Sequence, residues 1–182
     1  MKFILTLFLS MLAVAAAAAA VSSELRKKTR DLDMLELAKV NGPIIVLKRK
    51  HHTSTQLRCL SATKVETYSK TQYKYRLRAR NPSGIYEEED VLVTLFPSQG
   101  INKSKYTSQK TGLNVELTLK AMDNKKSCFV IFVQNSDGDN GCELLMQASE
   151  FTGIVPLDCA RYYEKQCSGD SIDLNVNSCM YK

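Results

Sequence analysis

The sequence predicts an all-β fold: an eight-stranded antiparallel up-and-down barrel with a short N-terminal helix and a further helix near the C-terminus. Three features of the 182-residue chain indicate it: an apolar leader, about a hundred residues of alternating apolar and polar side chains broken by turn residues, and six cysteines. Short strands spaced in this way are typical of a closed barrel or a sandwich. The terminal helix and the absence of a Cys-Trp-Cys pattern argue against an immunoglobulin sandwich. A barrel is therefore preferred, and one of this size has room for a small ligand.

The first twenty residues have the layout of a cleaved secretory signal. Lys2 precedes an apolar run over 3–14, and small residues continue to Ala20. No later apolar run approaches the ~18 residues that a membrane-spanning helix needs. We therefore expect a signal peptide at 1–20 and a single secreted domain at 21–182, rather than a membrane protein or a cytosolic enzyme.

The mature chain is expected to begin with a helix over 22–40. Ser23 is a candidate N-cap, Glu24 lies in the first turn, and the Asn-Gly-Pro run at 41–43 ends the helix. The hydrophobic period then changes to two, which is the period of β-strands. The strands expected from it cover 44–50, 56–64, 71–80, 90–96, 106–109, 113–121, 128–134 and 142–148.

Alternation is clearest over 71–80, where one face is aromatic or apolar and the other is basic. The first face carries Tyr73, Tyr75, Leu77 and Ala79, and the second carries Lys74, Arg76, Arg78 and Arg80. We expect the basic face to be the solvent-facing side of a barrel strand.

A second helix is expected from Pro156 to about Cys167. Proline suits the first turn of a helix, and Asp158 suits its N-terminus. A hairpin loop rich in Asp, Asn and Gly is expected at 135–141, and an extended segment over 172–180 follows the helix.

The six cysteines of a secreted chain predict three disulfides. Cys159 and Cys167 share one face of the expected helix, and Cys128 and Cys142 each begin a strand of the last hairpin. If these cysteines join the hairpin to the helix, chain direction and elimination favour the pairs Cys128–Cys159, Cys142–Cys167 and Cys59–Cys179, although other pairings stay open. No C-x-x-C pair occurs, so a zinc site is not expected.

That arrangement would point the alternate side chains of the hairpin into the barrel. These are Phe129, Ile131, Val133, Glu143, Leu145 and Gln147. Glu143 would then be a carboxylate among apolar neighbours, and a buried charge is costly unless it is paired. A cationic ligand is one possible partner, with Tyr73 or Tyr75 adding cation–π or hydroxyl contacts. Alternatively, Glu143 lies at a barrel mouth or pairs with an interior Arg or Lys.

Other polar features have simple structural interpretations. The basic run at 48–52 would suit glycosaminoglycan or an anionic lipid, but a solvated strand end and loop is favoured. The acidic run at 87–90 lacks calcium-loop spacing and is expected to be a loop leading into a strand. Asn102 begins a glycosylation sequon in an expected loop. No catalytic signature and no nucleic-acid recognition helix is present, so neither an enzyme nor a nucleic-acid partner is expected.

The cysteine-rich half of the chain resembles a known family. The residues Cys128, Cys142-Glu143-Leu144-Leu145, Cys159, Tyr163, Cys167 and Cys179, after a secretory signal and Cys59, are similar to the tick salivary lipocalins, also called tick histamine-binding proteins. The resemblance covers most of the mature chain. It implies an eight-stranded calyx barrel with a C-terminal helix. It also implies secretion at the feeding site and binding of host histamine, serotonin, leukotrienes, fatty acids, sterols or complement components.

The chain departs from the family's amine-binding motif at two positions. Amine-binding members carry Cys-Asp-(Val/Ile/Leu), then Glu-Leu-(Trp/Tyr), then Cys. Here Phe129 replaces the aspartate and Leu145 replaces the aromatic residue, while Glu143 and Leu144 match. The chain also lacks the Gly-x-Trp signature of other lipocalins. These changes make the expected wall more apolar and favour an apolar or amphipathic ligand.

The sequence therefore predicts a secreted, monomeric lipocalin that sequesters a small host mediator and needs no cofactor or metal. A hydrophobic mediator such as a leukotriene, fatty acid or sterol is favoured, and histamine or serotonin comes next. The alternative is a protein-binding immune or complement modulator that uses the barrel as a scaffold. The expected ligand contacts are Glu143, Phe129, Ile131, Leu145, Tyr73 and Tyr75.

Overall fold

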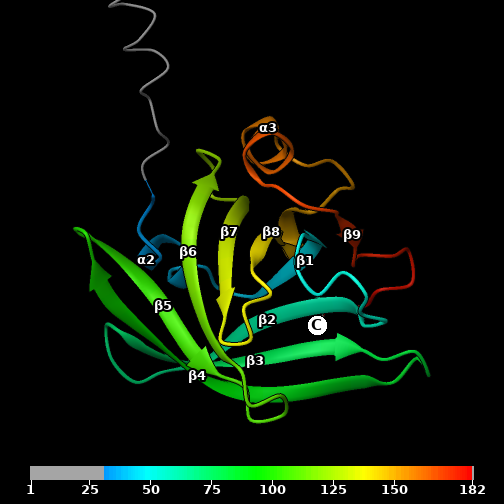
Figure 1. The fold of residues 1–182 in the computed structure, drawn as a ribbon, viewed down its shortest axis with the longest axis horizontal. Helices are drawn as coiled ribbons and strands as arrows, with labels where there is room; N and C mark the ends of the chain where they lie inside the picture. The colour runs from blue at the N-terminus through cyan, green and yellow to red at the C-terminus, as the bar shows by residue number, and fades with distance from the viewer. Residues whose placement is uncertain (1–30, 182) are drawn as a thin grey trace, which may run out of the picture. The chain divides into compact units, whose positions relative to one another are not determined.

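Eight antiparallel strands close into a barrel in the computed structural model, which describes residues 31–181 (Figure 1). From β2 to β8 each strand pairs with the next, and β1 closes the barrel by pairing with both β8 and β2. The predicted up-and-down barrel is therefore confirmed. The barrel strands are β1 (Pro43–Arg49), β2 (Arg58–Thr67), β3 (Gln72–Arg80), β4 (Tyr86–Ser98), β5 (Ile101–Thr107), β6 (Asn114–Met122), β7 (Cys128–Asn135) and β8 (Gly141–Gln147).

Shorter elements cover the ends and one side of the barrel. They are the helix α2 (Leu35–Ala38), the 3-10 turn η1 (Ala148–Glu150), the helix α3 (Leu157–Gln166) and the two-residue strand β9 (Ile172–Asp173), which pairs with β1. Within residues 31–181, no helix is long and apolar enough to cross a membrane.

The N-terminal helix is much shorter than predicted in the part of the chain that the structure describes. Residues 22–30 lie outside the described residues, and α2 is a single turn. Leu32 is extended rather than helical, because its backbone N–H donates to the carbonyl of Leu119 at 2.8 Å. Met34 and Leu37 then insert into the barrel core, so α2 covers one end of the barrel.

Two strands begin earlier than the sequence predicted. β4 starts at Tyr86, so the acidic run at 87–90 lies in a strand and not in a loop. Opposite charges across the β3–β4 ladder account for this, as in the pair Arg76 Nε–Asp90 Oδ1 at 2.8 Å. β5 starts at Ile101 because Gln99 and Gly100 both have positive φ, which makes a tight two-residue hairpin.

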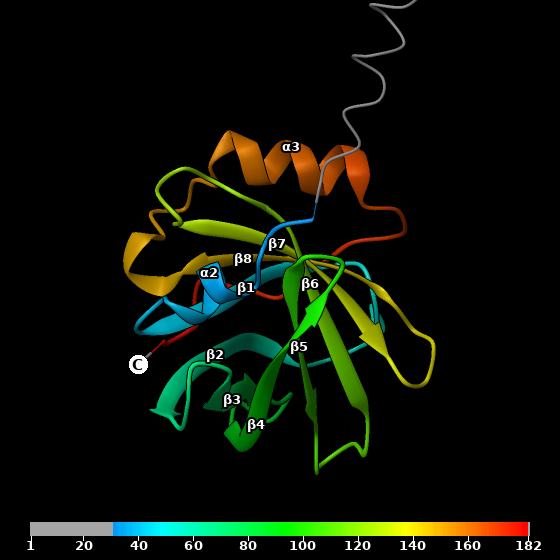
Figure 2. The ribbon, with the colours of Figure 1, turned by 90° about the vertical axis from the view of Figure 1, so that its left-hand side faces the viewer.

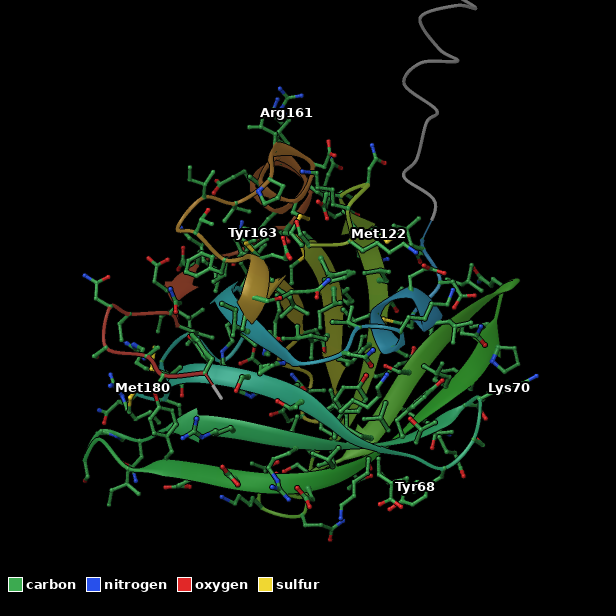
Figure 3. The ribbon with its side chains drawn as sticks, turned by 180° about the vertical axis from the view of Figure 1, so that it is seen from behind. Tyr68, Lys70, Met122, Arg161, Tyr163 and Met180 are labelled. Atoms are coloured by element: carbon green, nitrogen blue, oxygen red, sulfur yellow. A yellow bond between two sulfur atoms is a disulfide. The ribbon has the colours of Figure 1, made fainter. Side chains whose placement is uncertain are left out.

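The hairpin β7–β8 is buried on both faces, as predicted. Its inner side chains, Phe129, Ile131, Val133 and Leu145, belong to the core inside the barrel. Its outer side chains, Cys128, Val130, Leu144 and Met146, pack with Cys159 and Tyr163 of α3. Figure 2 shows α3 lying over β7 and β8. Tyr163 of α3 points toward this outer face, whereas Arg161 points away from the barrel (Figure 3).

The structure contains three disulfides, Cys128–Cys159, Cys142–Cys167 and Cys59–Cys179, and these are the pairs that chain direction and elimination favoured. The last one secures the C-terminal tail, of which only β9 is a strand, so the extended segment predicted over 172–180 is mostly irregular. Arg78 and Arg80 hold the tail by donating to the carbonyls of Met180 and Ser178.

Asp123 organises the turn that leads into Cys128. Its Oδ1 accepts the backbone N–H groups of Ser127 at 2.7 Å and Cys128 at 2.9 Å, and its Oδ2 accepts the Ser127 hydroxyl at 2.8 Å. Burial alone would raise the pKa of Asp123, but these hydrogen bonds outweigh burial and lower it.

We expect Asp123→Ala to reduce the free energy of unfolding by about 2 kcal/mol near neutral pH, because two backbone donors lose their acceptor. The folded pKa of Asp123 lies below its unfolded value. The stabilisation is therefore complete above about pH 4 and is lost as pH falls through the folded pKa. Urea denaturation at neutral and acidic pH measures both effects. Asp123→Asn keeps one acceptor oxygen and should cost less; equal stability of the wild-type protein and Asp123→Ala would contradict this role.

Candidate functional site

The barrel encloses a cavity of about 600 Å³. This volume lies within the range of roughly 300–1,000 Å³ that is usual for small-molecule sites. α2 and inward-facing residues of all eight strands line it, and most of the lining is apolar. The architecture therefore provides a pre-formed space for one small or medium-sized ligand.

The floor of the cavity is apolar and lies over α2. Its lining residues are Met34, which immediately precedes α2, Leu37 of α2, Leu95 of β4 and Tyr73 of β3. The Tyr73 hydroxyl donates to the carbonyl of Lys70 at 2.6 Å, so this side chain offers its ring to the cavity. A ligand reaching this depth must be apolar at that end.

Five of the six predicted contact residues line the cavity: Glu143, Ile131, Leu145, Tyr73 and Tyr75. Phe129 does not line it. Phe129 faces inward but is 0% exposed, opposite Met122 and Leu145 in the packed core. Gln147 also does not line it: opposite the core residue Ile44, it is on the inner face at the end of β8, where its side-chain amide donates to the carbonyl of Lys126 at 2.7 Å. That these residues contact a ligand stays a prediction.

Tyr75 brings a polar atom to the apolar wall. Burial raises the pKa of its phenol to about 12. It therefore remains protonated at neutral pH, and its hydroxyl makes no hydrogen bond to any of residues 31–181. A ligand oxygen or nitrogen at this height of the cavity would have a neutral hydroxyl available.

At the mouth, Glu143 pairs with a histidine rather than with a lysine or arginine. His51 Nε2 donates to Glu143 Oε1 at 3.0 Å. The Nδ1 atoms of His51 and His52 lie 3.2 Å apart, and His52 Nε2 lies 3.0 Å from Asp137 Oδ2. These contacts join the β1–β2 loop to the β7–β8 hairpin. Among the described residues, no group of three His, Cys, Asp or Glu side chains is placed to hold a metal ion.

The prediction that the basic run at 48–52 is solvated is wrong for two of its members: Arg49 is 9% exposed and His51 is 5% exposed. The reason is a β-bulge in β1 between Val46 and Lys48. The extra residue shifts the alternation, so Lys48 points outward, near Asp173, and Arg49 points into the barrel.

Arg49 is incompletely paired. One guanidinium nitrogen donates to the carbonyl of His52 at 3.2 Å, and Nε finds no acceptor among residues 31–181. Burial lowers the pKa of Arg49, while the charges of Glu143 and Asp139 offset part of that effect. The Arg49 guanidinium nevertheless remains cationic at neutral pH, because an arginine pKa lies far above it.

The inward-facing acidic residues of β4 have hydrogen-bond or ion-pair partners. Glu89 accepts the Ser108 hydroxyl at 3.0 Å and the backbone N–H groups of Gln109 at 2.5 Å and Lys110 at 3.2 Å. Glu87 lies 3.3 Å from the Lys110 ammonium. The loop after β5 therefore provides hydrogen-bond donors to Glu89 and one ammonium that balances the charge of Glu87.

β5 supplies lining residues that sequence reasoning missed. Ser104 and Tyr106 both line the cavity; burial raises the pKa of Tyr106, and the Ser104 hydroxyl is fully buried without a partner among the described residues. The strand predicted over 106–109 already contained Tyr106, and extending it back to the turn at 99–100 would have added Ser104 on the same face.

The glycosylation sequon lies in a strand rather than in the expected loop. The side-chain amide of Asn102 donates to both carboxylate oxygens of Asp33, at 3.1 and 2.9 Å. A glycan on this nitrogen would disrupt those contacts. Glycosylation of Asn102 stays a prediction.

Comparison with known proteins agrees with the barrel and its cavity. The family model described as tick histamine binding protein matches residues 32–181, which is nearly all of the described chain. A search of individually curated proteins finds no match. The match spans well over half of the sequence and includes all six cysteines and Glu143. The chain therefore belongs to the tick histamine-binding protein family.

Proposed function

We propose that this protein is secreted in saliva and sequesters a small hydrophobic mediator of the host in its barrel, thereby blunting host defence. One observation carries the proposal: the cavity of about 600 Å³ is mostly apolar, and the carboxylates at its mouth have partners within the protein. Three disulfides are typical of an extracellular protein. The protein acts stoichiometrically, and burial of the ligand's apolar surface supplies the affinity.

A leukotriene, fatty acid or sterol fits this lining better than a small amine. Leu145 stands where amine-binding members have an aromatic residue, and Phe129 stands where they have an aspartate. Glu143, the acidic residue that does match, already accepts a hydrogen bond from His51. A biogenic amine such as histamine is the second candidate, because Glu143 still lines the cavity and the family takes its name from that ligand.

The protein-binding alternative depends on the basic face of β3, and that face has other contacts. Arg76 pairs with Asp90, and Arg78 donates to the tail carbonyl of Met180 while its guanidinium stacks 3.8 Å from the Tyr86 ring. These arginines contribute to the barrel's outer surface and to tail attachment, which supports the cavity as the functional part.

Native mass spectrometry of the secreted protein is expected to reveal a co-purified hydrophobic small molecule. Titration calorimetry after delipidation should then rank leukotriene, fatty acid and sterol above histamine and serotonin. Sub-micromolar binding of either amine, with no binding of the hydrophobic ligands, would reverse the order proposed here.

A pair of adjacent substitutions tests whether the cavity is the binding site. Val93 lines the cavity, whereas Leu92 is 52% exposed on the outer face of the same strand. Val93→Trp should fill the space and weaken ligand binding by about tenfold or more, which corresponds to about 1.4 kcal/mol. Leu92→Trp should leave affinity unchanged.

The chain has no tryptophan, so each variant carries a single fluorescent reporter. Emission should be blue-shifted for Val93→Trp and solvent-like for Leu92→Trp, which verifies that both variants fold as described. Equal affinity in two correctly folded variants would exclude the cavity as the binding site.

A further inference from the structure

Two buried polar atoms of the cavity wall lack the partners that buried groups normally have. Within residues 31–181, the buried side-chain nitrogens and oxygens without a hydrogen bond are Arg49 Nε, Arg78 Nε and Ser104 Oγ. Arg78 Nε has a carboxylate oxygen of Glu88 at 3.3 Å to balance its charge. All three residues line the cavity, but Arg49 has no carboxylate oxygen within 4.0 Å, since Glu143 and Asp139 act on it only from farther away, and Ser104 has no partner among the described residues. An unsatisfied buried donor costs about 1–3 kcal/mol, and more when it is charged.

The residues around Arg49 do not provide an acceptor for its Nε. Glu143 is its cross-strand neighbour in β8, yet no ion pair within 4.0 Å joins them, and Glu143 Oε1 is hydrogen-bonded to His51. Asp139 influences Arg49 only at longer range and accepts the His52 backbone N–H at 2.8 Å. The remaining charged neighbour is another cation, Arg58, whose guanidinium donates to the carbonyls of Thr55 and Leu57.

At the mouth, the carboxylates therefore have hydrogen-bond partners, whereas the arginine has unused donors. Glu89 and Glu143 already accept hydrogen bonds, whereas Arg49 uses only one of its five N–H donors within residues 31–181, in the hydrogen bond to the carbonyl of His52. The Arg49 guanidinium therefore lacks a hydrogen-bond acceptor, and a negatively charged acceptor suits a guanidinium best. A ligand ammonium here would instead place a second cation beside a buried arginine, which is unfavourable at low dielectric.

We propose that the ligand is an amphipathic carboxylic acid and that Arg49 is its headgroup anchor. The carboxylate lies at the mouth against the guanidinium, and the hydrocarbon chain descends past Tyr75 and Leu145 to the floor formed by Leu37. This inference rests on the proposed function and narrows it: among hydrophobic mediators, those with a terminal carboxylate are selected over neutral sterols and over cationic amines.

Three ligands with one hydrocarbon chain and different headgroups test the selectivity: oleic acid, oleyl alcohol and oleylamine, each titrated below its aggregation limit at neutral pH. The delipidated protein should bind the acid about tenfold or more tightly than the alcohol and should bind the amine most weakly. If all three bind equally, the carboxylate anchor is refuted while hydrophobic sequestration stands. If none binds, the proposed function fails together with this inference.

Substitutions assign the selectivity to one side chain. Arg49→Met keeps an apolar stem and should weaken oleic acid about tenfold while changing oleyl alcohol by no more than about twofold. Arg49→Lys keeps the charge but loses the bidentate geometry and should be intermediate. Arg76→Met removes an arginine from the outer face and should leave both affinities unchanged. Equal losses for acid and alcohol in Arg49→Met would overturn the role; should that variant not fold, the comparison of headgroups in the wild-type protein still decides the inference.

Discussion

The structure depends on one constraint: the hairpin β7–β8 is buried on both faces. Its outer side chains are fixed against α3 by packing around Tyr163 and by the disulfides of Cys128 and Cys142. Because strand side chains alternate, fixing the outer set also fixes the inner set, which includes Ile131 and Leu145. A shift of one residue would place Cys128 and Cys142 in the barrel and the inner residues Phe129 and Ile131 beneath the helix, so the register of the cavity wall is strongly specified. The attachment of α3 outside the barrel therefore determines which side chains of β7–β8 line the cavity inside it.

The chemistry of the mouth has a different origin, which is the irregularity of β1. A regular strand would have turned Lys48 inward and Arg49 outward, and the flexible ammonium could then have reached many partners. The bulge after Val46 instead buries a guanidinium, whose rigid donors require an acceptor in a defined place. It also brings the chain to His51 at a point where that ring reaches Glu143. The extra residue of the bulge thus turns Arg49 into the cavity and brings His51 within hydrogen-bonding distance of Glu143.

Period-two alternation and cysteine spacing were sufficient to predict the barrel, the strand order and the two faces of β7–β8, because both patterns reflect burial that each strand must satisfy by itself. The features that were missed depend on irregular backbone or on contacts between distant segments. Nothing local to residues 48–52 distinguishes a buried Arg49 from a solvated one. Likewise, the cross-strand charges that make residues 87–90 a strand become apparent only once β3 is their neighbour. Phe129 was placed on the correct face but at the wrong depth, since alternation specifies the side of a sheet and not the height within a barrel.

The substitutions in the amine-binding motif and the hydrogen bonding at the cavity mouth both argue against a cationic ligand, and they do so independently. Phe129 and Leu145 remove an anion and an aromatic surface that would favour an ammonium, while His51 occupies the carboxylate that remains. Either change alone would weaken an amine site without creating another. Together with Arg49, which lines the barrel cavity and lacks an acceptor for Nε, they support the proposal that the ligand carries a negative charge. On this proposal, a family named for a cationic ligand is adapted to an anionic one with its strands, disulfides and helix unchanged: Leu145 and Arg49 lie on the cavity lining, and Phe129 is accommodated in the packed core beside it.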